Sequence, residues 1–134
     1  MAIKFVLDTH ALIWYLEGNP KLGQSALAVM DDETSEMVLP VIALAEAVYI
    51  VGKGRTSITT VSDLLQDVTG DNRIEIQDLT LPILQQSLAA SAVPEMHDRL
   101  IVASALYLES VGHSVSLLTK DSDIQSHAPI KIIW

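Results

Sequence analysis

Apolar and polar residues follow one another in blocks along the chain, and the first block predicts a buried strand. Residues 3–7 (Ile-Lys-Phe-Val-Leu) form a short, nearly continuous apolar run that stops at Asp8. Such a run is typical of a strand buried on both faces in the middle of a parallel sheet. A helical pattern begins at once, with apolar residues at Ala11, Leu12 and 14–16. We therefore expect Asp8 to lie where a buried strand ends and a helix begins.

The same pattern along the rest of the chain predicts short strands that alternate with helices. Further strands are expected where short apolar or alternating runs lie between turn signals, at residues 37–39, 74–76, 115–118 and 130–133. Apolar residues that recur at helical spacing predict helices at residues 25–32, 41–51, 57–68, 80–92 and about 95–111, with a short helix near Ile124. Strands that alternate with helices favour a parallel sheet with right-handed connections. The sequence therefore predicts a single α/β domain over residues 1–134, built around about five short parallel strands.

The segment 41–51 is apolar or nearly so at every position except Glu46. A helix that is apolar on all sides is expected to be largely buried. An ionised carboxylate within such a helix is costly unless it has a partner. That partner could be Lys53 or Arg55, or a metal ion shared with Asp8; alternatively, Glu46 lies on the one solvated stripe of the helix.

Other carboxylates are expected near the same place. Asp121 and Asp123 follow the strand at 115–118, and Asp98 lies near the start of the long helix. Each of them could simply cap a helix or a turn. The carboxyl ends of parallel strands share one edge of a sheet, however, where ligand sites of open α/β sheets lie. Four carboxylates gathered there would repel one another unless they were protonated or bound to metal, and hard oxygen ligands suit Mg²⁺ or Mn²⁺.

Charge and composition narrow the classes of function. The net charge of −9 argues against a non-specific nucleic-acid binder with a basic surface, but not against a nuclease with clustered carboxylates. The chain has no Cys, which excludes disulfides and thiolate metal sites and is compatible with a cytoplasmic location. No apolar run reaches the roughly 20 residues of a membrane helix, and no signal peptide is recognisable. We expect a cytoplasmic protein with no membrane association.

Four blocks of the sequence resemble, in order, the signature blocks of PIN-domain ribonucleases. They are residues 7–14 (LDTHALIW), 45–46 (AE), 97–106 (HDRLIVASAL) and 118–121 (LTKD), and the resemblance continues to the closing residues 129–134. Each block alone is weak, but the ordered set is specific. Within this family, the chain resembles the single-domain toxins of the VapC type. The resemblance implies a PIN-like α/β/α sandwich with a central parallel sheet.

The resemblance also implies roles for individual residues. Asp8, Glu46, Asp98 and Asp121 would form the acidic quartet that binds metal and carries catalysis. The supporting positions would be Thr9 and Thr119, with Asp123 able to share the fourth acidic role, and Arg99 and Lys120 would be possible RNA contacts. No histidine is needed as a general base, so we expect structural or surface roles for His10, His97, His113 and His127.

The reaction implied by the resemblance is Mg²⁺- or Mn²⁺-dependent endonucleolytic cleavage of RNA, in which water attacks phosphorus and leaves 5′-phosphate and 3′-hydroxyl ends. Toxins of this family are usually dimers that are inhibited by a small antitoxin protein. The chain also has more large apolar residues than a small monomer easily buries, which favours a homodimer. These residues are Trp14, Tyr15, Tyr49 and those of the helix around Ile50.

Three other functions were weighed. A phosphatase of the haloacid-dehalogenase type needs a second Asp two residues after the first, where this chain has His10. A phospho-receiver domain could place Asp78 after a strand, but no Lys follows Ile133. A catalytically weak PIN-fold module that binds RNA or protein remains the alternative to an enzyme.

Overall fold

Five parallel strands form the central sheet of the computed structural model, which describes residues 3–134. The strands follow the order β3-β2-β1-β4-β5, so β1 lies in the middle and pairs with β2 and β4. The predicted parallel sheet is confirmed, and the predicted strands differ from the observed ones by at most one residue at either end. The observed strands are β1 (Ile3–Leu7), β2 (Glu36–Pro40), β3 (Ile74–Gln77), β4 (Ser114–Leu118) and β5 (Lys131–Ile133).

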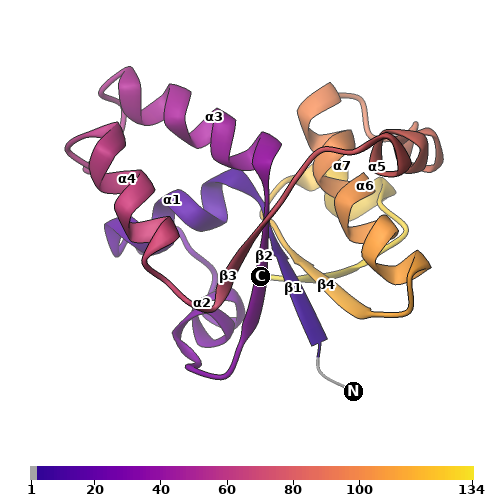
Figure 1. The fold of residues 1–134 in the computed structure, drawn as a ribbon, viewed down its shortest axis with the longest axis horizontal. Coiled ribbons are helices and arrows are strands. Elements are labelled where there is room, and N and C mark those ends of the chain that lie inside the picture. The colour runs from indigo at the N-terminus through magenta and orange to yellow at the C-terminus, as the bar shows by residue number, and fades with distance from the viewer. Residues whose placement is uncertain (1–2) are drawn as a thin grey trace.

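The helices cover both faces of this sheet. In Figure 1, α1 to α4 lie on one side of the strands, and α5, α6 and α7 lie on the other. The α/β/α sandwich that the resemblance implied is therefore present. None of the helices in residues 3–134 is long and apolar enough to cross a membrane. The helices are α1 (Thr9–Glu17), α2 (Gln24–Asp31), α3 (Val41–Gly52), α4 (Val61–Thr69), α5 (Leu81–Gln86), the 3₁₀ helix η1 (Ser87–Ala90), α6 (Met96–Ser110) and α7 (Ser122–His127).

Two predicted helices have different bounds in the structure. The helix expected at 57–68 begins only at Val61, because the hydroxyl of Thr60 accepts the N–H of Asp63 at 3.0 Å and so caps it there. Residues 58–60 before it are not helical, and the N–H of Ser57 donates to Glu17 of α1 at 2.7 Å. The predicted helix at 80–92 is shorter and divided: α5 ends at Gln86, and η1 continues with the tighter 3₁₀ winding.

The core forms where the sheet meets its helices. Val6 and Leu7 of β1 are fully buried, and so are Leu117 and Leu118 of the neighbouring β4. A strand at the centre of a parallel sheet has helices on both faces, so its end is shielded from water. Asp8, which follows β1 directly, is therefore held by a rigid element.

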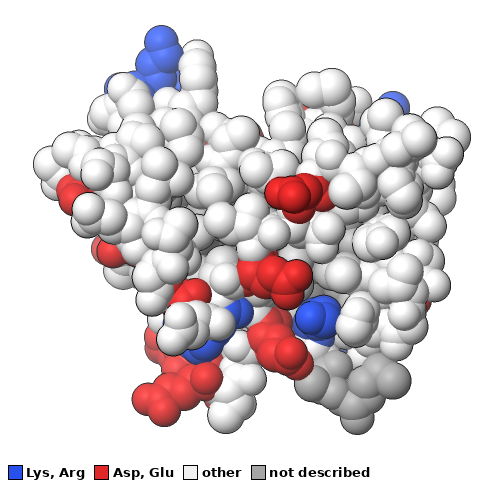
Figure 2. All heavy atoms as spheres, in the orientation of Figure 1, with Lys and Arg blue, Asp and Glu red and all other residues white. Residues whose placement is uncertain are grey.

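The helix at 41–51, expected to be largely buried, has one buried stripe and one exposed stripe in the structure. Ala43 and Ala47 of α3 are fully buried, but Tyr49 is 60% exposed. A helix that packs on a sheet buries one stripe, and here the opposite stripe is apolar as well. Figure 2 shows broad uncharged areas on this side of the molecule. Of the other residues expected to form a dimer surface, Trp14 and Tyr15 are partly buried and pack against the core.

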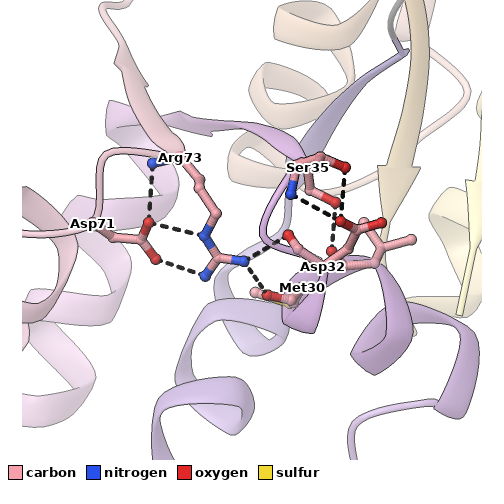
Figure 3. Close-up of polar contacts among 7 residues, drawn as sticks. Met30, Asp32, Ser35, Asp71 and Arg73 are labelled. Carbon is pink, nitrogen blue, oxygen red and sulfur yellow. Dashed lines mark hydrogen bonds and ion pairs between the residues drawn. The ribbon is translucent and has the colours of Figure 1, made fainter.

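A network around Arg73 fastens α2 to the turn before β3, as Figure 3 shows. The Nε and Nη2 atoms of Arg73 donate to the carboxylate of Asp71 at 3.1 and 2.9 Å. Nη1 donates to the main-chain carbonyls of Met30 at 2.7 Å and Asp32 at 2.9 Å. The hydrogen bond from Arg73 lowers the pKa of Asp71. The network ties segments about 40 residues apart without taking part in the site described below.

Candidate active site

A cavity of about 400 Å³ lies at the carboxyl ends of the central strands. These ends point to the upper edge of the molecule in Figure 1, and Figure 2 shows a hollow at the same edge, between the half with α3 and the half with α6. The residues that line the cavity come from α1, α3, the start of α6 and the segment after β4, and they include all four predicted acids. They are Asp8, His10, Trp14, Glu46, Glu95, Asp98, Lys120 and Asp121.

Asp8 is the most firmly held of the acids. One carboxylate oxygen, Oδ1, accepts the N–H of Thr9 at 2.7 Å, and Oδ2 accepts the hydroxyl of Thr119 at 2.5 Å. Burial raises the pKa of Asp8, and the two hydrogen bonds act in the opposite direction. Asp8 also occupies the N-cap position of α1, so the capping role and the site role fall on the same side chain.

Glu46 reaches the cavity from α3 and is connected to Asp8 through the neighbouring residue. The hydroxyl of Thr9, which is fully buried, donates to Glu46 Oε1 at 2.7 Å. Within residues 3–134 no ion pair joins Glu46 to Lys53 or Arg55, the alternative partners that the sequence suggested. Glu46 is half-buried rather than enclosed.

Asp121 meets Asp8 at a shared threonine. The hydroxyl of Thr119 donates to Asp8 and accepts the N–H of Asp121 at 3.0 Å. Asp121 Oδ1 accepts the N–H of Ile124 at 2.9 Å and so caps α7. Asp123 is exposed in the first turn of α7 and does not line the cavity. Of the two candidates for the fourth acid, Asp121 is the one that faces the other three.

Asp98 stands in the first turn of α6, where its pKa is raised to about 7, first by burial and then by the negative charges of Asp121 and Asp8. Glu95 holds this turn in place, because its Oε2 accepts the N–H of Asp98 at 2.9 Å. Burial disfavours the charged form of Asp98, and the like charges of the acids that share its cavity act in the same direction. Glu95 was missed by the sequence analysis, although its position directly after Pro94 and three residues before Asp98 is that of an N-cap.

The remaining predicted residues have mixed outcomes. Lys120 lines the cavity, as expected of a residue that contacts substrate. Arg99 does not, because its guanidinium donates to the main-chain carbonyls of Val93 and Ser91 and so fastens the loop before α6. His97 is bound through Nδ1 to Glu95 at 2.6 Å, a hydrogen bond that raises the pKa of His97. His10 was expected to be structural or merely on the surface, but it lines the cavity.

The donor chemistry of the cavity fits a hard divalent cation, since carboxylate oxygens are the ligands that Mg²⁺ and Mn²⁺ prefer. Glu46 and Asp121 each use one oxygen in the hydrogen bonds given above. As the side chains stand, no group of three or more Asp, Glu or His residues among residues 3–134 is placed to hold a metal ion. The acids therefore suit a divalent metal in their chemistry and share one cavity, while their side chains as they stand are not grouped around a common metal position.

A comparison with known protein families identifies the family of this chain. A family model described as PIN domain matches residues 5–129. The chain belongs to the PIN domain family. The match runs from β1 to the segment before β5 and so contains every residue of the predicted quartet. A search of curated proteins returned no match to this PIN domain.

Solved structures share the fold over nearly the whole chain. The VapBC2 structure from Rickettsia felis, bound to a DNA fragment from its promoter, is 16% identical, with a TM-score of 0.70 and coverage of 97% of both chains. DNA-bound VapBC from Salmonella typhimurium is 22% identical, with a TM-score of 0.65 and coverage of 98% of this PIN domain and 97% of that chain. A toxin–antitoxin complex from Klebsiella pneumoniae is 16% identical, with a TM-score of 0.64 and coverage of 96% and 95%. At these identities the likeness shows the fold alone.

Proposed function

We propose that this PIN domain is a Mg²⁺- or Mn²⁺-dependent endoribonuclease that acts in the cytoplasm as the toxin of a toxin–antitoxin pair. The observation that carries the proposal is that Asp8, Glu46, Asp98 and Asp121, from four separate places in the fold, line one cavity. If these acids served only to cap helices and turns, nothing would require them to face the same cavity. Acids that meet in one cavity, with Asp98 among them at a raised pKa, are typical of a functional site.

The four acids would hold the metal, and the two threonines would orient them. Thr119 fixes Asp8 and the main chain of Asp121, and Thr9 fixes Glu46, so two of the acids and the segment that carries the third are positioned by buried hydroxyls. When bound, Mg²⁺ or Mn²⁺ would lower the pKa of a water and offset charge on the phosphate. In the reaction the water oxygen forms a bond to phosphorus, the bond from phosphorus to the 3′ oxygen breaks, and the 3′ oxygen takes a proton.

An antitoxin partner and a homodimer are part of the same proposal. Support for the antitoxin comes from the fold shared with VapBC pairs and with a structure titled as a toxin–antitoxin complex. Support for self-association comes from large apolar side chains that remain exposed on α3 and around α5. These are Val41, Tyr49, Leu81, Leu84 and Leu88.

The test of the catalytic proposal is Glu46→Gln, measured for RNA cleavage and melting temperature on the same sample. The substitution keeps the size of the side chain and removes its charge. We expect wild-type protein, freed of any partner, to cleave RNA only with Mg²⁺ or Mn²⁺. Glu46→Gln should fold normally and lose cleavage by about a hundredfold or more, the scale for one electrostatic contributor to a transition state.

Glu109→Gln is the matched control, because Glu109 is exposed on α6 and does not line the cavity. It should cleave like the wild type. A Glu46→Gln protein that is destabilised but fully active would remove Glu46 from the catalytic group. Wild-type protein that binds RNA with metal present but never cleaves it would favour the alternative, a catalytically weak binding module.

A further inference from the structure

The wall of the cavity beside the acids is aromatic and basic. His10 and Trp14 stand four residues apart on α1 and so share one face of that helix. Their ring centroids are 5.3 Å apart, with the ring planes inclined at 49°. Trp14 is partly buried, packs against the core, and has its ring centroid 5.8 Å from that of Trp134, with the ring planes inclined at 63°. His10 is exposed at the cavity, so a fixed indole supports an accessible imidazole.

Two lysines flank the same indole, but only one faces the cavity. The Nζ atom of Lys120 lies 5.5 Å from the centroid of Trp14, and that of Lys21 lies 5.9 Å from it. Lys120 lines the cavity and directly precedes Asp121, whereas Lys21 is not among the lining residues. Within residues 3–134, Lys120 is thus the one lysine or arginine among the residues that line the cavity, and it lies beside the Trp14 ring.

We propose that His10, supported by Trp14, is a stacking platform for one unpaired base of an RNA substrate, with Lys120 bound to the phosphate beside that base. This inference rests on the proposed function and adds to it a residue that contacts a base of the RNA. Aromatic side chains stack on bases of single strands, which are free to leave their own stack. With a net charge of −9, the chain cannot hold RNA through a broadly basic surface, so affinity must come from local contacts of this kind.

Fluorescence offers a direct test, because the chain has two tryptophans and both belong to this cluster. A mixed-sequence RNA 12-mer is titrated into the protein with Ca²⁺ in place of Mg²⁺, and tryptophan quenching gives the dissociation constant. We expect His10→Ala to weaken binding by about fivefold to a hundredfold, the range for loss of one stacked base. His10→Phe should restore most of that loss, and His10→Gln should not, because only the phenyl ring can stack.

Lys21→Ala is the matched control for Lys120→Ala, since both lysines lie by the same ring and both are exposed. Lys120→Ala should weaken binding and flatten its salt dependence, and Lys21→Ala should do neither. The 12-mer annealed to its complement should bind far less tightly than the single strand.

The inference is overturned if His10→Ala binds RNA like the wild type, if folded His10→Phe binds no better than His10→Ala, or if the duplex binds as tightly as the single strand. Equal effects of the two lysine variants would also overturn it. A wild-type protein that shows the expected binding pattern but no cleavage with Mg²⁺ or Mn²⁺ would refute the proposed enzyme while supporting the platform, so the two failures are distinguishable.

Discussion

Replacement of Thr119 by Val tests how the site is held together. Thr119 is fully buried, its hydroxyl donates to Asp8 at 2.5 Å, and the same hydroxyl accepts the N–H of Asp121 at 3.0 Å. Valine has nearly the same shape without the hydroxyl. The substitution therefore removes both hydrogen bonds and leaves little or no cavity, so packing is not the main change.

The size of the effect follows from those two bonds. A hydrogen bond to an ionised group contributes about 1.5–3 kcal/mol, and leaving the partly buried N–H of Asp121 unpaired costs about 1 kcal/mol more. The sum is a destabilisation of about 2.5–4 kcal/mol. For a chain of 134 residues the entropy of unfolding is roughly 0.28 kcal/mol/K, so the melting temperature should fall by about 9–14 °C.

Thermal unfolding followed by circular dichroism measures the shift. Thr34→Val is the control, because the hydroxyl of Thr34 also donates to an aspartate, Asp32 at 2.7 Å, but in an exposed place. Thr119→Ser keeps the hydroxyl and should lose far less than Thr119→Val. The reasoning is refuted if Thr119→Val lowers the melting temperature no more than Thr34→Val does.

Three further predictions follow from the charges and the exposed surface. Mg²⁺ or Mn²⁺ should raise the melting temperature by several degrees, because a ligand bound only by the folded state stabilises that state. The variants Asp8→Asn and Asp121→Asn should lose most of that rise. Equal rises in the wild type and both variants would contradict the metal site. Arg73 lowers the pKa of Asp71 below its ordinary value of 3.8, so the ionised form contributes stability that is present above that pH and is lost as the pH falls through the folded pKa. Urea unfolding should therefore show Asp71→Asn to be less stable than the wild type by about 0.5–1.5 kcal/mol at pH 7 and pH 5, with a difference that shrinks below about pH 4. If the difference in free energy of unfolding between the two proteins stayed constant from pH 7 to pH 3, the charge of Asp71 would not be its cause. Light scattering at tens of micromolar should return the mass of a homodimer, and a monomer mass would count against the proposed interface.

The sheet was predictable from the sequence because its strands are short apolar runs bounded by turn residues. Its topology then places Asp8 and Asp121 at one edge without any knowledge of side-chain contacts. The start of α4 was not predictable in the same way, because Ser57 and Thr60 are both acceptable caps and the structure uses Thr60. No Gly or Pro marks the change from α5 to η1, so its location had no local signal.

The site was predictable as a set of acids and less so as a cavity. The sequence did not place Glu95, His10 and Trp14 on the wall of the cavity, because their positions there depend on how the helices pack. The spacing of His10 and Trp14 after Asp8 could nevertheless have placed these two residues on one helix face beside it. Arg99 illustrates the opposite error. Arg99 follows Asp98 directly in the sequence but does not line the cavity with it. The main-chain carbonyls of Val93 and Ser91 bind the guanidinium of Arg99 instead.

The pairing of β1 with β4 sets the time at which the acidic cavity can be completed during synthesis. The hydrogen bond from Thr119 to Asp8 joins residues 111 positions apart in the sequence. Contacts so distant form late and slowly, since a long loop must close before they stabilise anything. During synthesis, a nascent chain that has not yet released β4 from the ribosome has Asp8 but lacks the threonine that positions it and the acid that completes the group. If the protein is a toxin, the time taken to synthesise the chain between Asp8 and Thr119, which lie 111 positions apart, is time in which the cell can supply an inhibitor.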